Sequence, residues 1–221
     1  MRGNYPASSK ITAGIQKILA LGDSNTLCSF LTNPAGGYRY YLKDFVRARN
    51  IWWVGTKGVS GESDWLPCEA VGGYTCSLIA GLATPAITAF SPHICILLGG
   101  QNDLSGSTVD QAEAAHASLV DGIFTQSPNI KLIVCTIHRT TQANDADVVL
   151  LNARIRNTVV TRKAAGKNIY LCDLRAATDA IPDAQYLAAS PDGYLAADGS
   201  HLLWNGHILW ASILQPILDV I

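Results

Sequence analysis

One serine of the sequence stands where a nucleophile could be presented to a substrate. Ser24 lies in the segment Gly22-Asp23-Ser24-Asn25, directly after the apolar run at 17–21. Glycine permits a sharp turn at such a point, which can bring the Ser24 hydroxyl to the edge of a sheet. A serine hydroxyl attacks a carbonyl only when a base removes its proton and a carboxylate holds that base in the correct tautomer.

The base and the carboxylate that this chemistry requires occur together late in the chain. Asp198 and His201 stand three residues apart in Asp198-Gly199-Ser200-His201, so one short loop can carry both side chains. Taken alone, each segment is ordinary, because Gly-Asp-Ser often caps a helix and Asp-Gly often forms a turn. Their combination predicts a hydrolytic triad of Ser24, His201 and Asp198.

The tetrahedral intermediate of such a reaction needs hydrogen-bond donors for its negative oxygen. Asn102, in the segment 99–103 after another apolar run, offers a side-chain amide, and the backbone N–H of Ser24 offers a second donor. A third donor is expected from a glycine in the Gly-rich segment 55–75.

The elements that position these residues can be predicted from apolar patterns. The nearly continuous apolar runs, which indicate strands covered on both faces as in a parallel sheet, are 17–21, 51–54, 93–98, 131–137 and 168–174. Helical patterns lie between and after them at 38–49, 77–86, 109–125, 147–165 and 205–221. This alternation predicts a three-layer α/β/α sandwich around a parallel sheet of about five strands. Its functional groups should gather at the carboxyl ends of the strands.

Length and composition limit the class of protein. We expect a flexible lead-in at 1–16 and a single domain at 17–221. With 48% hydrophobic and 15% charged residues, the 221-residue chain is too apolar to be disordered. The net charge of −1 gives no electrostatic basis for binding nucleic acid. No apolar run reaches the roughly 18 residues of a membrane span, and the oligomeric state cannot be predicted.

Cysteine and histidine patterns predict neither a metal nor another cofactor. Three cysteines fall in strand-like runs and are expected to be buried, namely Cys95, Cys135 and Cys172. Three others are expected in loops, namely Cys28, Cys68 and Cys76, and a disulfide between the last two is left open. The sequence contains no Cys-x-x-Cys pair, the pattern that would suggest a zinc site. His116 lies on the apolar face of a predicted helix, as a core residue would. The chain contains no signal-peptide pattern, which suits a mature secreted form or a cytoplasmic protein.

The three polar segments together resemble the SGNH (GDSL) hydrolases, a superfamily of serine esterases and lipases. Segment 18–25 resembles their first block, segment 100–103 their third, and segment 198–201 their last. The resemblance covers about 17–217 and implies a flavodoxin-like sandwich. It also implies that Ser24 is the nucleophile, that Asn102 is an oxyanion donor, and that Asp198 and His201 complete the triad. The second block of the family supplies a glycine donor, for which Gly61 and Gly73 are both candidates. We favour Gly73 because the helix-like stretch 77–86 follows it at once.

Further segments are similar to carbohydrate esterase family three, the acetylxylan esterases. These are Gly36-Gly37-Tyr38-Arg39, Trp53-Val54-Gly55 and 69–75. The usual His-Glu-Gly-His-x-Gly of that family corresponds here to 68–73, which lacks both histidines and keeps Gly73. The resemblance implies hydrolysis of acetyl esters on a carbohydrate such as xylan.

Other functions remain as alternatives. The chain has no lid-sized apolar insertion, which favours short acyl groups over the substrates of a thioesterase, lysophospholipase or general arylesterase. A carbohydrate-binding protein without activity is a more distant alternative. Aromatic residues that could stack on sugars, although packing is the more common role of each, are Trp52, Trp53, Trp65, Tyr74 and Tyr194. The absence of Gly-x-Ser-x-Gly disfavours the α/β-hydrolase fold, and no P-loop motif predicts nucleotide binding.

Overall fold

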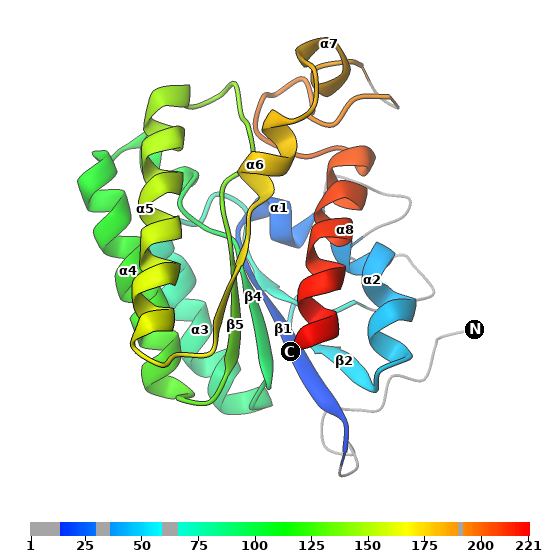
Figure 1. The fold of residues 1–221 in the computed structure, drawn as a ribbon, viewed down its shortest axis with the longest axis vertical. Helices are drawn as coiled ribbons and strands as arrows, with labels where there is room; N and C mark the ends of the chain where they lie inside the picture. The colour runs from blue at the N-terminus through cyan, green and yellow to red at the C-terminus, as the bar shows by residue number, and fades with distance from the viewer. Residues whose placement is uncertain (1–13, 30–35, 59–65, 190–191) are drawn as a thin grey trace.

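The computed structural model describes residues 14–29, 36–58, 66–189 and 192–221. At its centre lies a parallel sheet with the order β2-β1-β4-β5-β6 (Figure 1). Its strands are β1 (Gln16–Gly22), β2 (Ile51–Val54), β4 (Ile94–Leu97), β5 (Lys131–Cys135) and β6 (Ile169–Cys172). A short sixth strand, β3 (Glu69–Ala70), pairs with the end of β1. The predicted parallel sheet is therefore confirmed.

Burial on both faces explains why these strands have no polar face. In β1, Leu19 and Leu21 join one core cluster, whereas Ile18 and Ala20 join the cluster on the opposite face. All four side chains are fully buried. Because successive side chains of a strand point to opposite faces, a strand covered on both sides must be apolar throughout.

Helices cover both faces of the sheet and complete the three layers. One face carries α3 (Cys76–Phe90), α4 (Val109–Gln126) and α5 (Asp145–Ala164), and the other carries α2 (Tyr38–Arg47) and α8 (Trp204–Val220) (Figure 1). The short helices are α1 (Ser24–Leu27), the 3-10 helix η1 (Asn102–Ser105), α6 (Leu174–Asp179) and α7 (Asp183–Tyr186). The predicted sandwich is confirmed, with helices 38–49, 109–125, 147–165 and 205–221 found within two residues of their expected bounds.

Capping residues and charges stabilise the ends of α4 and α5. Thr108 and Gln111 form a reciprocal capping box at the start of α4. Helix α5 begins after Asn144, whose side chain accepts a hydrogen bond from the N–H of Ala146. Acidic residues in its first turn and basic residues in its last turn complement the helix dipole.

The structure corrects three details of the sequence-based prediction. Gln16 already belongs to β1, whereas residues 1–13 of the expected lead-in lie outside the described residues. The helix expected at 77–86 extends to Phe90 and contains Pro85. Cys76 begins α3 instead of lying in a loop, and the disulfide left open between Cys68 and Cys76 is not formed, since both thiols are free and buried.

Candidate active site

The first polar segment forms a tight turn from β1 into α1. Ser24 is the first residue of α1, and the Asp23 side chain caps this helix by accepting a hydrogen bond from the N–H of Asn25 (3.0 Å). Gly22 is required for close packing, because an added Cβ would lie 2.4 Å from Thr26 Oγ1 and 2.6 Å from the carbonyl oxygen of Leu98. The turn leaves Ser24 half-buried at the carboxyl end of β1.

The segments that carry Ser24, His201 and Asp198 meet at this edge of the sheet. Ser24 Oγ lies 2.9 Å from His201 Nε2, and His201 Nδ1 lies 2.6 Å from Asp198 Oδ2. The other carboxylate oxygen of Asp198 accepts hydrogen bonds from the N–H groups of Ser200 (2.9 Å) and His201 (3.1 Å). Three side chains expected from sequence to act together are thus in one hydrogen-bonded line.

The electrostatics of Asp198 suit a carboxylate that stays ionised. Partial burial raises its pKa, but the hydrogen bonds from the His201 ring and from the N–H groups of Ser200 and His201 outweigh burial. The pKa of Asp198 therefore lies below its ordinary value. An ionised carboxylate at this position holds the Nδ1 proton of His201 and leaves Nε2 to face Ser24.

The segment that carries Gly73, the glycine expected to donate to the oxyanion, forms a turn beside Ser24. The N–H of Tyr74 donates to the carbonyl of Val71 (3.3 Å), with Gly72 and Gly73 between them. Gly73 has φ +78°, as the third residue of a type II turn requires. An added Cβ at Gly73 would meet nothing within 4 Å, whereas one at Gly72 would lie 3.7 Å from Ser24 Cβ. Backbone conformation, and not lack of space, is thus the reason for glycine at position 73.

Asn102 is joined to this turn through Tyr74. It begins η1 after β4, and its Nδ2 donates to the carbonyl of Tyr74 at 3.0 Å. A side-chain amide has two N–H groups, so a second donor remains for a substrate oxygen. The competing candidate Gly61 lies outside the described residues.

Sequence reasoning missed the polar residues that join these segments. The Asn25 side chain donates to the carbonyl of Ser200 (3.1 Å) and accepts from the N–H of Leu202 (2.9 Å). Gln101 Nε2 donates to Ser200 Oγ at 2.7 Å. Both residues are buried. Their only sequence signal is that each is a polar residue next to a residue predicted to act in catalysis.

Asp23 is a further buried carboxyl group at this edge. Its side chain is 2% exposed. Burial raises its pKa to about 6, and nearby Asp103 adds to this rise, while the hydrogen bond from Asn25 and the charge of His201 act in the opposite direction. The ordinary value is 3.8, so the fold favours the protonated form of Asp23.

The remaining expectations concern metals, membranes and aromatic residues. In the described ranges, no cluster of His, Cys, Asp or Glu side chains could hold a metal ion. Likewise, no helix there is both long and apolar enough to cross a membrane. Trp53 is 5% exposed and packs edge-on against Tyr38, so it belongs to the core. Tyr194 stacks on Tyr186, and Trp65 lies outside the described residues.

A comparison with known families identifies the chain. The model of the GDSL-like lipase/acylhydrolase family matches residues 20–207, which is most of the sequence. The chain belongs to the GDSL-like lipase/acylhydrolase family. The resemblance to the SGNH (GDSL) hydrolases is thereby confirmed.

Individual relatives of this GDSL-like chain include carbohydrate esterases. It is 28% identical over 202 residues to a multidomain esterase of Ruminococcus flavefaciens, covering 77% of this chain but only 26% of that protein. A family 3 carbohydrate esterase from Clostridium thermocellum is 25% identical and superposes with a TM-score of 0.74 over 93% of this chain and 96% of the other. A family 3 carbohydrate esterase from Talaromyces cellulolyticus has the same fold, with a TM-score of 0.73, 18% identity, and 93% and 97% coverage. The chain thus spans about a quarter of the curated relative and nearly the whole of the two solved structures.

Proposed function

We propose that this GDSL-like chain is a serine esterase in which Ser24 is the nucleophile, His201 the general base and Asp198 the residue that orients the base. The observation that carries the proposal is the unbroken line of contacts, 2.9 Å from Ser24 Oγ to His201 Nε2 and 2.6 Å from His201 Nδ1 to Asp198 Oδ2. Residues 17–221 act in this proposal as a single catalytic domain.

The reaction proceeds through an acyl-enzyme. His201 Nε2 takes the proton of Ser24 as Oγ attacks the ester carbonyl, and the same nitrogen then returns the proton to the departing alcohol. In the second half, His201 deprotonates a water molecule as it attacks the acyl carbonyl, and then returns this proton to Ser24 Oγ as the ester bond breaks and the carboxylic acid leaves. Asp198 stabilises the imidazolium that forms in each half without taking its proton.

Three donors hold the developing negative oxygen in this proposal. They are the backbone N–H groups of Ser24 and Gly73 and the side-chain amide of Asn102. The first N–H groups of a helix have no acceptor within the helix, which leaves the N–H of Ser24 available at the start of α1. The N–H of Gly73 is directed by a turn that Asn102 holds through the Tyr74 carbonyl.

The proposed substrate is a short acyl ester, above all an acetyl group on a carbohydrate such as xylan. The family 3 carbohydrate esterase that is 25% identical over nearly its whole length supports the carbohydrate part of this proposal. A panel of acetylated xylan, acyl-CoA and nitrophenyl esters of rising chain length tests it. Preference for octanoate over acetate, or for acyl-CoA, would replace it with a lipase or thioesterase function.

Covalent labelling tests the nucleophile directly. A fluorophosphonate should label the protein once, and Ser24→Ala should abolish labelling and lower kcat for nitrophenyl acetate roughly 10⁴- to 10⁶-fold. Ser212→Ala, on the outer side of α8, is the matched control and should behave like the unchanged protein. Labelling or substantial activity that survives in Ser24→Ala would refute the proposal, and a fully unreactive wild type would favour a binding protein.

A further inference from the structure

The carbonyl group of Gly199 has more hydrogen-bond donors than a carbonyl in a short turn requires. It accepts from the hydroxyl of Thr140, from the N–H of Thr141 at 2.9 Å and from the N–H of Gln142 at 3.3 Å. All three donors come from the loop between β5 and α5. A carbonyl oxygen has two lone pairs, so three donors directed at it leave this peptide little freedom to rotate.

The turn that is held in this way carries both Asp198 and His201. Gly199 lies between them with φ +73°, and an added Cβ would approach Thr141 Oγ1 to 2.1 Å. The next carbonyl, that of Ser200, accepts from the Asn25 side chain at 3.1 Å. The turn is therefore held from two sides. The β5–α5 loop donates to the carbonyl of Gly199, and the side chain of Asn25 in α1 donates to the carbonyl of Ser200.

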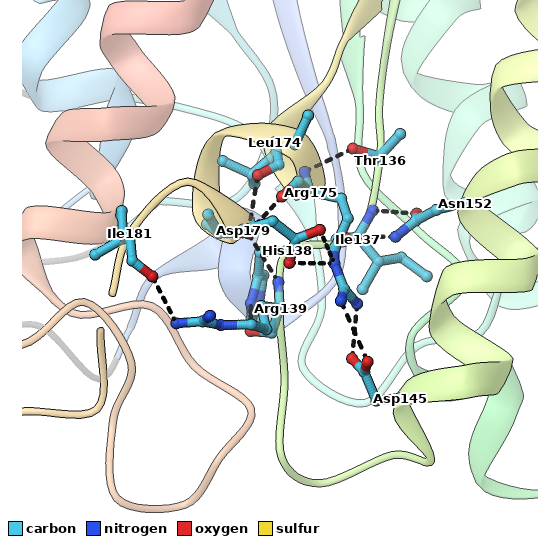
Figure 2. Close-up of polar contacts among 12 residues, drawn as sticks. Thr136, Ile137, His138, Arg139, Asp145, Asn152, Leu174, Arg175, Asp179 and Ile181 are labelled. Carbon is cyan, nitrogen blue, oxygen red and sulfur yellow. Dashed lines mark hydrogen bonds and ion pairs between the residues drawn. The ribbon is translucent and has the colours of Figure 1, made fainter. Parts of the chain in front are cut away.

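The β5–α5 loop is itself anchored at both ends by buried polar side chains (Figure 2). At its start, the Asn152 side chain donates to the carbonyl of Ile137 and accepts from the N–H of Ile137, both at 2.8 Å. At its end, Arg175, whose side chain is 7% exposed, pairs with Asp145 at 2.8 Å.

The middle of the loop is fixed as well. The N–H of Arg139 donates to Thr178 Oγ1 at 3.0 Å, and its guanidinium donates to the carbonyl of Ile181 at 3.3 Å (Figure 2). These hydrogen bonds hold the β5–α5 loop in one position relative to α5 and α6. The loop can therefore hold the Gly199 peptide, which it contacts, in a fixed position.

We propose that Thr140 is a positioning residue for His201, acting through the Gly199 carbonyl. The inference rests on the proposed esterase function. The Thr140 hydroxyl donates to Gly199 and accepts from the N–H of Gln142 (3.2 Å), so it joins the rigid loop to the turn. In this role Thr140 makes no contact with the substrate. Its effect is to keep His201 Nε2 at its 2.9 Å separation from Ser24 Oγ.

The expected effect of losing this contact is kinetic. A misplacement of about 1 Å between reacting groups can cost roughly 100-fold in rate, and a turn that loses one of several contacts should shift by less. Thr140→Val, which keeps the branched shape and removes the hydroxyl, should therefore lower kcat about 10-fold and leave KM within about twofold. Thr140→Ser, which keeps the hydroxyl, should restore kcat to within about twofold of the unchanged enzyme.

Thr136→Val provides a closely matched control. The Thr136 hydroxyl is also buried, also donates once, to Asp173 Oδ1 at 3.0 Å, and also accepts once, from the N–H of Arg175 at 2.9 Å. Both partners of this hydroxyl, Asp173 and Arg175, lie outside the 198–201 turn. Its substitution should lower thermal stability much as Thr140→Val does, but kcat should stay within about twofold.

The experiment measures kcat, KM and melting temperature for these variants on nitrophenyl acetate, with amide hydrogen exchange of residues 198–202. Faster exchange of the turn and lower kcat in Thr140→Val alone would support the inference. Equal kcat in Thr140→Val and Thr136→Val would overturn it, as would failure of Thr140→Ser to restore activity. Ser24→Ala is measured in parallel, because activity that survives there refutes the esterase mechanism itself, whereas its loss beside an unaffected Thr140→Val refutes only the positioning role.

Discussion

Replacing Asp23 with asparagine should stabilise the protein, and should do so only at neutral and alkaline pH. Burial raises the pKa of Asp23 from 3.8 to about 6, so the folded chain binds this proton more tightly than the unfolded chain does. The contribution of Asp23 to stability is then fully present below about pH 3.8 and is lost as the pH rises through about 6. Asparagine cannot ionise, and its side-chain oxygen can still accept the helix-capping hydrogen bond from the N–H of Asn25.

The size of the effect follows from the two pKa values. A difference of about two pKa units corresponds to about 3 kcal/mol of unfolding free energy, at about 1.4 kcal/mol for each unit. For a chain of this length, that gain corresponds to a rise of roughly 6–12 °C in Tm. At pH 4, Asp23 is almost neutral in the folded protein but about half ionised in the unfolded chain, whose pKa is the ordinary 3.8. The stability difference should therefore fall below about 1 kcal/mol.

The assay compares urea unfolding and Tm of the unchanged protein and Asp23→Asn at pH 4 and pH 8. Taking the difference between the two proteins removes the contributions of titrating groups that do not interact with Asp23. Asp44→Asn, where the carboxylate is 85% exposed, is the control and should change stability by less than about 0.5 kcal/mol at either pH. A stability difference that is independent of pH, or one that shrinks as the pH rises, would refute the reasoning.

Three further predictions concern the oxyanion donors and the absence of a metal requirement. Asn102→Ala should lower kcat about 10²- to 10³-fold with little change in KM, because its amide acts on developing charge; a change confined to KM would contradict this. Gly73→Ala should lower kcat through the left-handed backbone that alanine resists, since its Cβ meets no neighbour, whereas Gly61→Ala should stay near wild type. The reverse pattern, with both proteins folded by circular dichroism, would assign the role to Gly61. Dialysis against EDTA should leave ester hydrolysis unchanged, and activity restored by added zinc or calcium would disprove this.

Most of the sheet could be predicted from the sequence because each strand is apolar on both faces. The long helices could be predicted for a related reason, since amphipathic stretches such as 109–125 carry a pattern that repeats over several turns. The short helices α1 and α6 could not, because four to six residues are too few for such a pattern. The helix expected at 77–86 includes Pro85 but stops short of Phe90, where α3 ends.

The residues proposed to react were easier to find in the sequence than the residues that hold them in place. Ser24, Asp198 and His201 have residue types and neighbours that indicate chemistry, and Ser24 directly follows a strand, where the functional groups of a parallel sheet gather. Thr140 and Gln101 have common residue types, and their roles depend on contacts with residues about 60 and 100 positions away. No local pattern encodes such contacts. The choice of Gly73 as a donor stays a prediction.

The contact between Ser24 and His201 has a consequence for the order of events during folding. These residues are 177 positions apart, and closing a loop of that length costs about 5 kcal/mol of chain entropy. All six strands in the described part of the chain lie before residue 173, so each of them precedes the segment that carries the proposed base. Helix α8 in this last segment also covers one apolar face of the sheet, so that face stays open until the segment docks. In the proposed esterase, hydrolysis during refolding should therefore report the docking of residues 173–221 together with the closure of the Ser24–His201 contact.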